Sequence, residues 1–204
     1  KEIDYHSKYI DNKKISSIFF GGGTPSLMDP SIIERILAHL FSRCNIENDT
    51  EITMEANPTS VELQKFRDYS NIGVNRISIG VQSLDNDDLK NLGRTHTAEL
   101  AIEAIGIAQK YFESVSIDLI YARPGQNEKA WKLELERALS LQTQHLSLYQ
   151  LTIEPNTIYE KLYKSGKINL PNESLSNELY QITEEICHKF SLKKYEISNF
   201  SKRG

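Results

Sequence analysis

Five predicted strands of this chain end in glycine-rich or polar residues, and the chemistry of these residues points to one small-molecule site. The run Gly21-Gly22-Gly23-Thr24 follows the first strand. Glycines let the backbone approach a ligand and point N–H and C=O groups at it, and the threonine adds a hydroxyl. Glu55 ends the second strand and can accept hydrogen bonds from hydroxyl groups or an ammonium group. A tight turn and a solvated glutamate are the structural alternatives for these two signals.

The later strands add an amide, a guanidinium and an acid. Gln82 follows the third strand and Arg94 lies beyond it, so the two could grip a carboxylate at one rim, although a surface arginine is the simpler alternative. Asp118 lies inside the apolar fourth strand, where an unpaired charge is costly, so it needs a partner or a ligand. Tyr149 and Gln150 end the fifth strand, where they line a site or pack in the core.

These signals together predict a ligand that carries hydroxyl, ammonium and carboxylate groups. An aminoacyl-nucleoside fits this description better than a phosphate compound, because no GxGxxG motif or phosphate-binding loop follows any strand. Cys44 and Cys187 lie far apart and outside any metal-binding spacing, so no metal ligand is assigned.

Strands that alternate with helices must position these residues. The strands are predicted over residues 15–20, which should be buried, and over 51–55, 74–79, 114–121, 145–151 and 195–200. Asp29 and Pro30 mark the start of one helix. Thr59 and Glu62 form a capping box that opens another helix, which runs to about Tyr69. This order predicts a parallel sheet with right-handed crossovers, either open or closed into a barrel, with its ligand site at the carboxyl ends of the strands.

Apolar residues at helical spacing predict the helix faces that cover the sheet. The first helix carries them at Ile32, Ile33, Ile36, Leu37, Leu40 and Phe41. The helix over residues 127–141 carries them at Trp131, Leu135, Ala138 and Leu139.

Composition excludes several classes of protein. The 204 residues are 39% apolar and 25% charged, which is typical of a globular chain with one core, so we predict a single core domain over residues 1–204. The net charge is −4 and basic residues are scattered, so no nucleic-acid partner is expected. No apolar run approaches the about 20 residues that span a bilayer. The N-terminal residues also lack the apolar part of a signal peptide, so a cytoplasmic protein is expected.

Six motifs, in this order, resemble the radical S-adenosylmethionine (SAM) family. They are FFGGGTPSL at 19–27, EANP at 55–58, NRISIGVQS at 75–83, LGRTH at 92–96, DLIY at 118–121 and LYQLTIEP at 148–155. The most similar branch contains the oxygen-independent coproporphyrinogen III oxidases and the HemW heme chaperones. The resemblance implies an α/β fold, a partial (β/α)6 radical-SAM-type barrel that here lacks its first strand and its cluster loop. The family's CxxxCxxC loop precedes the GGGTP strand and is not found in these residues.

The resemblance also implies roles for the residues at the strand ends. The positions that would hold S-adenosylmethionine are Gly22, Gly23, Thr24 and Glu55. The positions that match contacts to a second such molecule in the oxidases are Gln82, Arg94 and Asp118. The family's Tyr-Gly-Leu-Pro appears here as Tyr121-Ala122-Arg123-Pro124, which places a bulky cation near the site. No catalytic residue is assigned.

Three functional readings follow from this resemblance. The segments LTIEPNT at 151–157 and YEISNF at 195–200 favour a heme chaperone that delivers heme to respiratory heme proteins. The alternative is an enzyme of heme biosynthesis that oxidises a porphyrinogen, with coproporphyrinogen dehydrogenase chemistry. Both use S-adenosylmethionine and a [4Fe–4S] cluster whose ligands are not in these residues. The third reading is a truncated, inactive fragment without the family's C-terminal helical domain, and it should be poorly soluble because a missing strand exposes a sheet edge.

Overall fold

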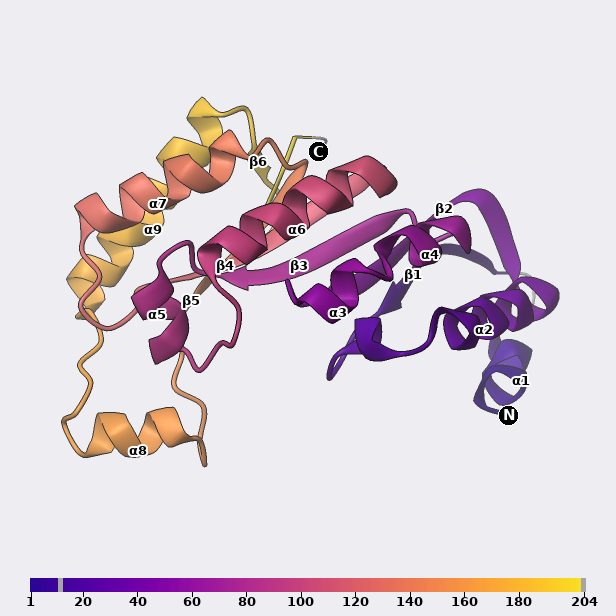
Figure 1. The fold of residues 1–204 in the computed structure, drawn as a ribbon, viewed down its shortest axis with the longest axis horizontal. Coiled ribbons are helices and arrows are strands. Elements are labelled where there is room, and N and C mark those ends of the chain that lie inside the picture. Colours follow the sequence, from indigo (N-terminus) through magenta and orange to yellow (C-terminus); the bar gives the residue numbers. More distant parts are fainter. Residues whose placement is uncertain (11–12, 203–204) are drawn as a thin grey trace. The chain divides into compact units, whose positions relative to one another are not determined.

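The structure is a computed structural model that describes residues 1–10 and 13–202. The chain forms two compact units. Lys1–Gly80 and Glu103–Val115 form the N-terminal unit, and Val81–Ile102 and Ser116–Gly204 form the C-terminal unit. Figure 1 shows the helices and strands of both units, labelled where there is room.

In the N-terminal unit, parallel strands alternate with helices. The elements that lie within it are α1 (Glu2–His6), η1 (Ser7–Tyr9), β1 (Lys14–Phe20), η2 (Pro25–Leu27), α2 (Pro30–Arg43), β2 (Asn45–Ala56), α3 (Ser60–Leu63) and α4 (Phe66–Asn71). Elements shared with the other unit are β3 (Arg76–Gln82), α6 (Ala98–Tyr111) and β4 (Ser114–Tyr121). Strand β2 pairs in parallel with β1 and with β3. Strand β3 begins and ends later than the strand predicted over residues 74–79. Gln82 is its last residue instead of following it.

In the C-terminal unit, a parallel pair of strands is extended by an antiparallel hairpin. Its remaining elements are α5 (Asn86–Asn91), α7 (Glu128–Ser140), β5 (His145–Gln150), α8 (Ile158–Lys164), α9 (Glu173–Lys189), β6 (Lys193–Lys194) and β7 (Asn199–Ser201). Strand β4 pairs in parallel with β5, whereas β7 pairs in antiparallel with both β5 and β6.

The last predicted strand, over residues 195–200, is wrong in extent and direction. Most of these residues form the turn between β6 and β7. Glu196 explains the turn, because its carboxylate accepts hydrogen bonds from Ser198 N at 3.0 Å and from Asn199 Nδ2 at 2.7 Å. Local side-chain bonds of this kind compete with an extended ladder. The sheet is therefore mixed in the C-terminal unit instead of purely parallel.

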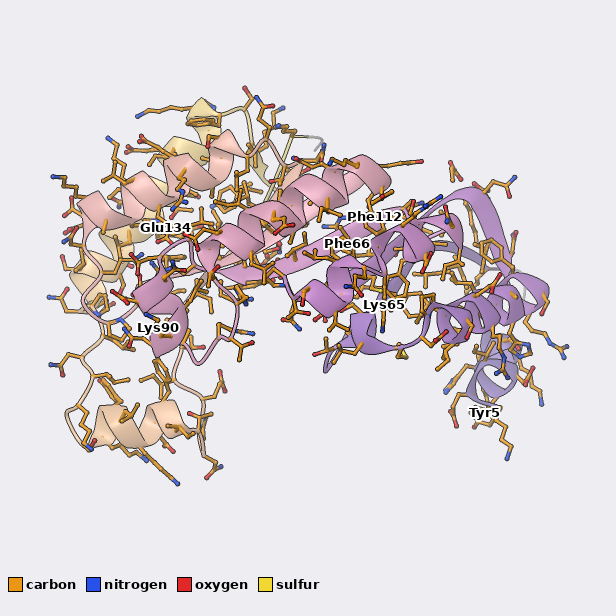
Figure 2. The ribbon with its side chains drawn as sticks, in the orientation of Figure 1. Tyr5, Lys65, Phe66, Lys90, Phe112 and Glu134 are labelled. Carbon is orange, nitrogen blue, oxygen red and sulfur yellow. The ribbon has the colours of Figure 1, made fainter. Side chains whose placement is uncertain are left out.

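Each unit has an aromatic core. In the N-terminal unit, Phe66 and Phe112 meet edge to face with ring centroids 5.6 Å apart (Figure 2). In the C-terminal unit, Trp131 stacks on Tyr121 at 5.4 Å and donates a hydrogen bond to Thr183 Oγ1 at 2.8 Å. This bond satisfies the indole N–H, as a buried Trp requires. The predicted inner face of α7 is confirmed, since Trp131, Leu135, Ala138 and Leu139 are all buried.

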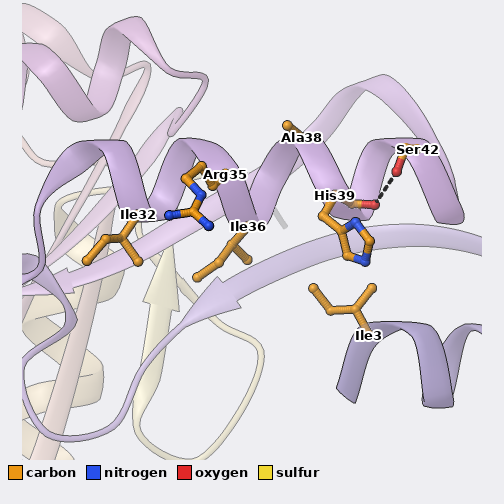
Figure 3. A pocket seen from close by; sticks show the side chains of 7 residues that line it. All are labelled: Ile3, Ile32, Arg35, Ile36, Ala38, His39 and Ser42. Atoms are coloured by element: carbon orange, nitrogen blue, oxygen red, sulfur yellow. Dashed lines mark hydrogen bonds between the residues drawn. The ribbon is translucent and has the colours of Figure 1, made fainter. Parts of the chain in front are cut away.

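The predicted inner face of α2 is only partly buried. Ile33 and Leu37 are in the core, but Ile32 and Phe41 each remain 43% exposed. Side chains of α2 instead line an open groove of about 800 Å³ together with Ile3 of α1 (Figure 3). Strand β1 is likewise not the buried strand that was predicted, because Phe19 is 58% exposed. Among the residues that the structure describes in this unit, β1 pairs with β2 alone.

The predicted capping box at Thr59 and Glu62 does not form, and two short helices, α3 and α4, replace the single predicted helix. The Glu62 side chain is buried and accepts hydrogen bonds from Asn57 N at 2.7 Å and from Thr59 Oγ1 at 3.1 Å. It also contacts Ser26 Oγ of η2. Glu62 therefore ties the turn after β2 to the loop after β1 instead of capping a helix.

Candidate functional site

The loop after β1 and the end of β2 bring predicted site residues together. Phe20 lies opposite Met54 in the parallel register, so the glycine loop leaves the sheet beside Glu55. Gly22 N donates a hydrogen bond to Glu55 Oε2 at 3.1 Å. Gly22 and Gly23 have φ angles of +81° and +56°, which favour glycine. The loop geometry thus places backbone groups and one carboxylate at the same strand ends.

Thr24 follows the three glycines of this loop and directly precedes η2. Asn57 Nδ2, at the turn after β2, donates a hydrogen bond to Thr24 Oγ1 at 3.4 Å. The next residues, Pro25 and Ser26, are buried in η2. The structure therefore gathers the glycine loop, Glu55 and Thr24 at the carboxyl ends of β1 and β2, as predicted for a ligand site of a parallel sheet.

The side chains of Lys65 and of Tyr69 in α4 bind the backbone of the segment that follows this loop. Lys65 Nζ donates hydrogen bonds to the carbonyls of Leu27 at 2.7 Å and Met28 at 3.0 Å. Tyr69 OH donates to the carbonyls of Ser26 at 3.0 Å and Met28 at 2.6 Å. Burial raises the pKa of Tyr69 to about 12, so the phenol keeps its proton and remains a donor. Sequence reasoning did not identify these two residues, because neither lies at a strand end.

The other predicted site residues belong to the C-terminal unit, at three separate places along the chain. Gln82 ends β3 with φ at +68° and is half-buried. Arg94 is exposed and follows α5, where its N–H donates to the carbonyl of Leu89 at 2.9 Å. Asp118 is half-buried in β4, opposite Ser147 of β5. Their joint action on one ligand stays a prediction.

Arg123, the cation expected near the site, is instead fully enclosed in the C-terminal unit, with 2% of its surface exposed. Its guanidinium forms ion pairs with Glu134 of α7 and, at 2.8 Å, with Asp88 of α5. Its Nη1 also donates to the carbonyl of Ile120 at 2.7 Å. Glu134 in turn accepts from Ser83 Oγ at 2.7 Å, so the cluster joins the loops after β3 and β4.

The Arg123 guanidinium and the Glu134 carboxylate are enclosed by protein, whereas the Asp88 side chain is 28% exposed. Burial raises the pKa of Asp88, even though Arg123 lies beside it. If one partner of such an ion pair is removed, the other is left as a buried charge without compensation, which destabilises the fold. Arg123 is therefore a structural link between helices and strand-end loops. One sequence signal could have identified Glu134 as the partner of Arg123. It is a carboxylate beside Trp131 and Leu135 on an otherwise apolar helix face.

The thiols of the chain do not fit an iron–sulfur cluster. Cys44 is half-buried in the N-terminal unit and Cys187 is buried in the C-terminal unit. Burial raises the pKa of the Cys187 thiol to about 12, whereas a cluster binds several thiolates. Within residues 1–10 and 13–202, no group of three or more His, Cys, Asp or Glu side chains is arranged to hold a metal ion. None of the described helices has the length and apolar character to cross a membrane.

Comparison with known proteins connects this geometry to a family. Residues 1–138 match the pattern of the radical SAM superfamily. The chain is 40% identical to the heme chaperone HemW of Buchnera aphidicola from Schizaphis graminum, over 99% of this chain and 53% of that protein. It is 38% identical to the mitochondrial radical S-adenosyl methionine domain-containing protein 1 of Danio rerio, over 100% of this chain and 46% of that protein. The chain thus spans about half the length of these relatives.

A solved structure is similar in fold. Coproporphyrinogen III oxidase (HemN) from Escherichia coli, described as a radical SAM enzyme, superposes with a TM-score of 0.83. The match covers 98% of this chain and 46% of that chain, at 24% sequence identity. This likeness confirms the predicted α/β fold with a parallel-rich, barrel-type sheet.

Proposed function

Because the chain belongs to the radical SAM superfamily, we propose that the protein containing it is a HemW-like heme chaperone, which binds heme and passes it to heme proteins. The observation that carries this proposal is the similarity along the whole chain to proteins named heme chaperone HemW, at 40% identity in Buchnera aphidicola and 37% in Escherichia coli. Respiratory heme proteins are the proposed acceptors. A cytoplasmic location is part of the proposal, although relatives named as mitochondrial also exist.

The residues at the ends of β1 and β2 suit S-adenosylmethionine. The Glu55 carboxylate is half-buried and already accepts the Gly22 N–H, so it can accept an ammonium group in the same place. The carbonyl groups of Gly22 and Gly23 and the Thr24 hydroxyl would bind the remaining polar groups of the methionine part. When bound, S-adenosylmethionine supplies a radical to the family's reactions.

Gln82, Arg94 and Asp118 are proposed as contacts to a second S-adenosylmethionine molecule. An arginine and an amide suit a carboxylate, and an aspartate suits an ammonium group or ribose hydroxyls. The [4Fe–4S] cluster is proposed to be held by cysteines outside these residues. The chain's own two thiols do not fit the cluster.

The test uses the full-length protein that contains this chain, purified and reconstituted without oxygen. A heme chaperone should bind heme and transfer it to an apo-cytochrome, and should leave coproporphyrinogen III unchanged when S-adenosylmethionine is present. Turnover of coproporphyrinogen III would overturn the proposal in favour of the oxidase. Absence of both iron retention and heme binding would favour an inactive remnant.

A matched pair of variants tests the S-adenosylmethionine site separately. Glu55→Gln removes the negative charge and should weaken binding of S-adenosylmethionine at least about tenfold, since hydrogen bonds between charged groups are about twice as strong as neutral ones. Glu103→Gln, which changes a glutamate of α6 in the same unit, should leave the affinity unchanged. Equal affinities of the Glu55→Gln variant and the unchanged protein, by isothermal titration, would remove Glu55 from the site.

A further inference from the structure

A chain of three hydrogen-bonded side chains in the C-terminal unit ends at the surface. His145 Nε2 lies 2.8 Å from Tyr195 OH, and His145 Nδ1 lies 2.6 Å from Ser116 Oγ. Exposure rises along the chain, from 0% for Ser116 to 7% for His145 and 60% for Tyr195. A buried imidazole therefore lies directly behind the hydroxyl of an exposed phenol.

The strand register holds this arrangement in place. Ser116 of β4 lies opposite His145 of β5, and His145 lies opposite Ser201 of β7. Tyr195 begins the turn between β6 and β7, where its N–H donates to the carbonyl of Asn199 at 3.2 Å. The phenol thus reaches His145 from a hairpin whose backbone is fixed on both sides of the turn.

Core packing alone does not require this hydroxyl. An exposed phenylalanine would fill the same space as Tyr195, and a buried histidine is usually satisfied by a backbone carbonyl or water. His96 is of that kind, since its Nε2 bonds the carbonyl of Val81 at 3.0 Å. His145 instead uses both ring nitrogens on side-chain hydroxyls. This pattern is typical of a group that orients and activates another residue.

We propose that Tyr195 is an axial ligand for the ferric iron of heme, and that His145 and Ser116 position it. The inference rests on the proposed heme-chaperone function. Tyrosinate is one of the side chains that hold heme iron in proteins. The outer partners of a metal ligand set its protonation and orientation, which is the relation of His145 to Tyr195.

The ligation step balances without any oxidant or reductant. The O–H bond of Tyr195 breaks and a bond forms between its oxygen and ferric iron, while the proton passes to His145 Nε2. The imidazolium then donates from Nε2 to the phenolate and from Nδ1 to Ser116 Oγ, and the iron keeps its oxidation state. Return of the proton from His145 restores the neutral phenol, a much weaker ligand. This reversal gives a delivery protein a way to release its heme.

The surface around Tyr195 offers apolar contacts for a porphyrin. His145, Ser147 and Tyr149 share one face of β5, because side chains alternate along a strand. Tyr149 is 45% exposed. Ile197, in the same turn as Tyr195, is 68% exposed. These two side chains would cover part of the macrocycle.

The test is a titration of the full-length protein with ferric heme, followed by absorption and electron paramagnetic resonance spectra. Tyr195→Phe keeps the ring and removes the ligand oxygen, so it should abolish the phenolate-to-iron charge-transfer band and weaken heme binding at least about tenfold. His145→Gln should weaken heme binding by about 10- to 100-fold, as for other outer-shell partners. Tyr163→Phe is the matched control, because Tyr163 of α8 is also exposed, at 49%, and should bind heme like the unchanged protein.

The outcomes separate this inference from the proposed function. If the unchanged protein binds and transfers heme and Tyr195→Phe has the same spectrum and affinity, the Tyr195 site is wrong while the chaperone function stands. If the unchanged protein binds no heme, both proposals fall. Circular dichroism of Tyr195→Phe and His145→Gln establishes that both variants are folded, and the Tyr195→Phe result decides even if His145→Gln does not fold.

Discussion

At the residue scale, Gly22 is where the backbone conformation of the predicted ligand loop can be tested directly. Its φ of +81° lies in the left-handed region, and a Cβ there would meet no neighbouring atom. Gly22→Ala should therefore lower the free energy of unfolding by about 1–3 kcal/mol, through backbone strain and not through a clash. Urea denaturation measures the change.

Gly106 is the matched control for this substitution. It lies inside α6, and a Cβ added there would also meet no atom. Gly106→Ala should raise the free energy of unfolding by about 0.5–1 kcal/mol, because glycine is unfavourable inside a helix. The two substitutions are chemically identical and should have opposite signs; a stabilising Gly22→Ala would show that the loop does not hold a left-handed residue.

His96 gives a second prediction at this scale, because burial lowers its pKa below the ordinary value of 6.5, with Arg94 adding to the effect. The unfolded chain then binds a proton at this residue that the folded chain does not. Stability due to His96 is therefore complete above pH 6.5 and declines as the pH falls from there toward the lower folded pKa. Between pH 7 and pH 5, the unfolded chain should bind up to about one more proton at His96 than the folded chain does. This difference should lower the free energy of unfolding as the pH falls.

His96→Gln keeps a donor for the Val81 carbonyl and cannot titrate, so its stability should decline less over the same pH range. His188→Gln changes an exposed histidine at the end of α9 and should keep the full decline. Equal slopes for His96→Gln and the unchanged protein, in denaturation at several pH values, would contradict a lowered pKa at His96.

At the element scale, the cluster of Arg123, Glu134 and Asp88 joins two helices to the loop after β4. Arg123→Met would fill a similar volume but leave the buried Glu134 carboxylate and the partly exposed Asp88 carboxylate without their cation. Removing one partner of a buried ion pair costs about 3–5 kcal/mol. We expect Arg123→Met to lower the free energy of unfolding by that amount in chemical denaturation.

Arg94→Met is the control for loss of one positive charge in the same unit. Arg94 is exposed, and such surface substitutions usually change stability by less than about 0.5 kcal/mol. If both variants lost the same stability, the Arg123 cluster would contribute no more than a surface charge does.

At the scale of the whole molecule, β1 determines how residues 1–204 should behave when expressed alone. Strand β1 is mostly exposed, with Phe19 at 58%, and exposed strands of this kind promote association between chains. Ser17→Lys would place a charge in the middle of β1, opposite Glu51. It should reduce aggregation in light scattering.

Ser165→Lys adds the same charge at an exposed position after α8, outside any strand, and should leave aggregation unchanged. Equal improvement by both variants would show that net charge matters and the β1 edge does not. A monomeric chain that unfolds cooperatively without any substitution would contradict the expected poor solubility.

The sequence by itself determined the alternation of the first five strands with helices, and it placed Gly22, Thr24 and Glu55 at the ends of the first two strands. These features depend on neighbours in the chain, such as apolar periodicity and helix caps like Asn127, whose side chain accepts from Ala130 N. The family resemblance likewise depends on short motifs in a fixed order, which the comparisons confirm.

Only the tertiary structure decided which partners the polar side chains choose. Glu62 bonds Ser26, 36 residues away, instead of capping its own helix. The Arg123 side chain turns inward to Glu134 and Asp88, and Tyr195 reaches His145 across 50 residues. The reason is physical: a buried polar group must find a partner, and in a folded chain that partner is set by which strands and helices pack together rather than by position along the sequence.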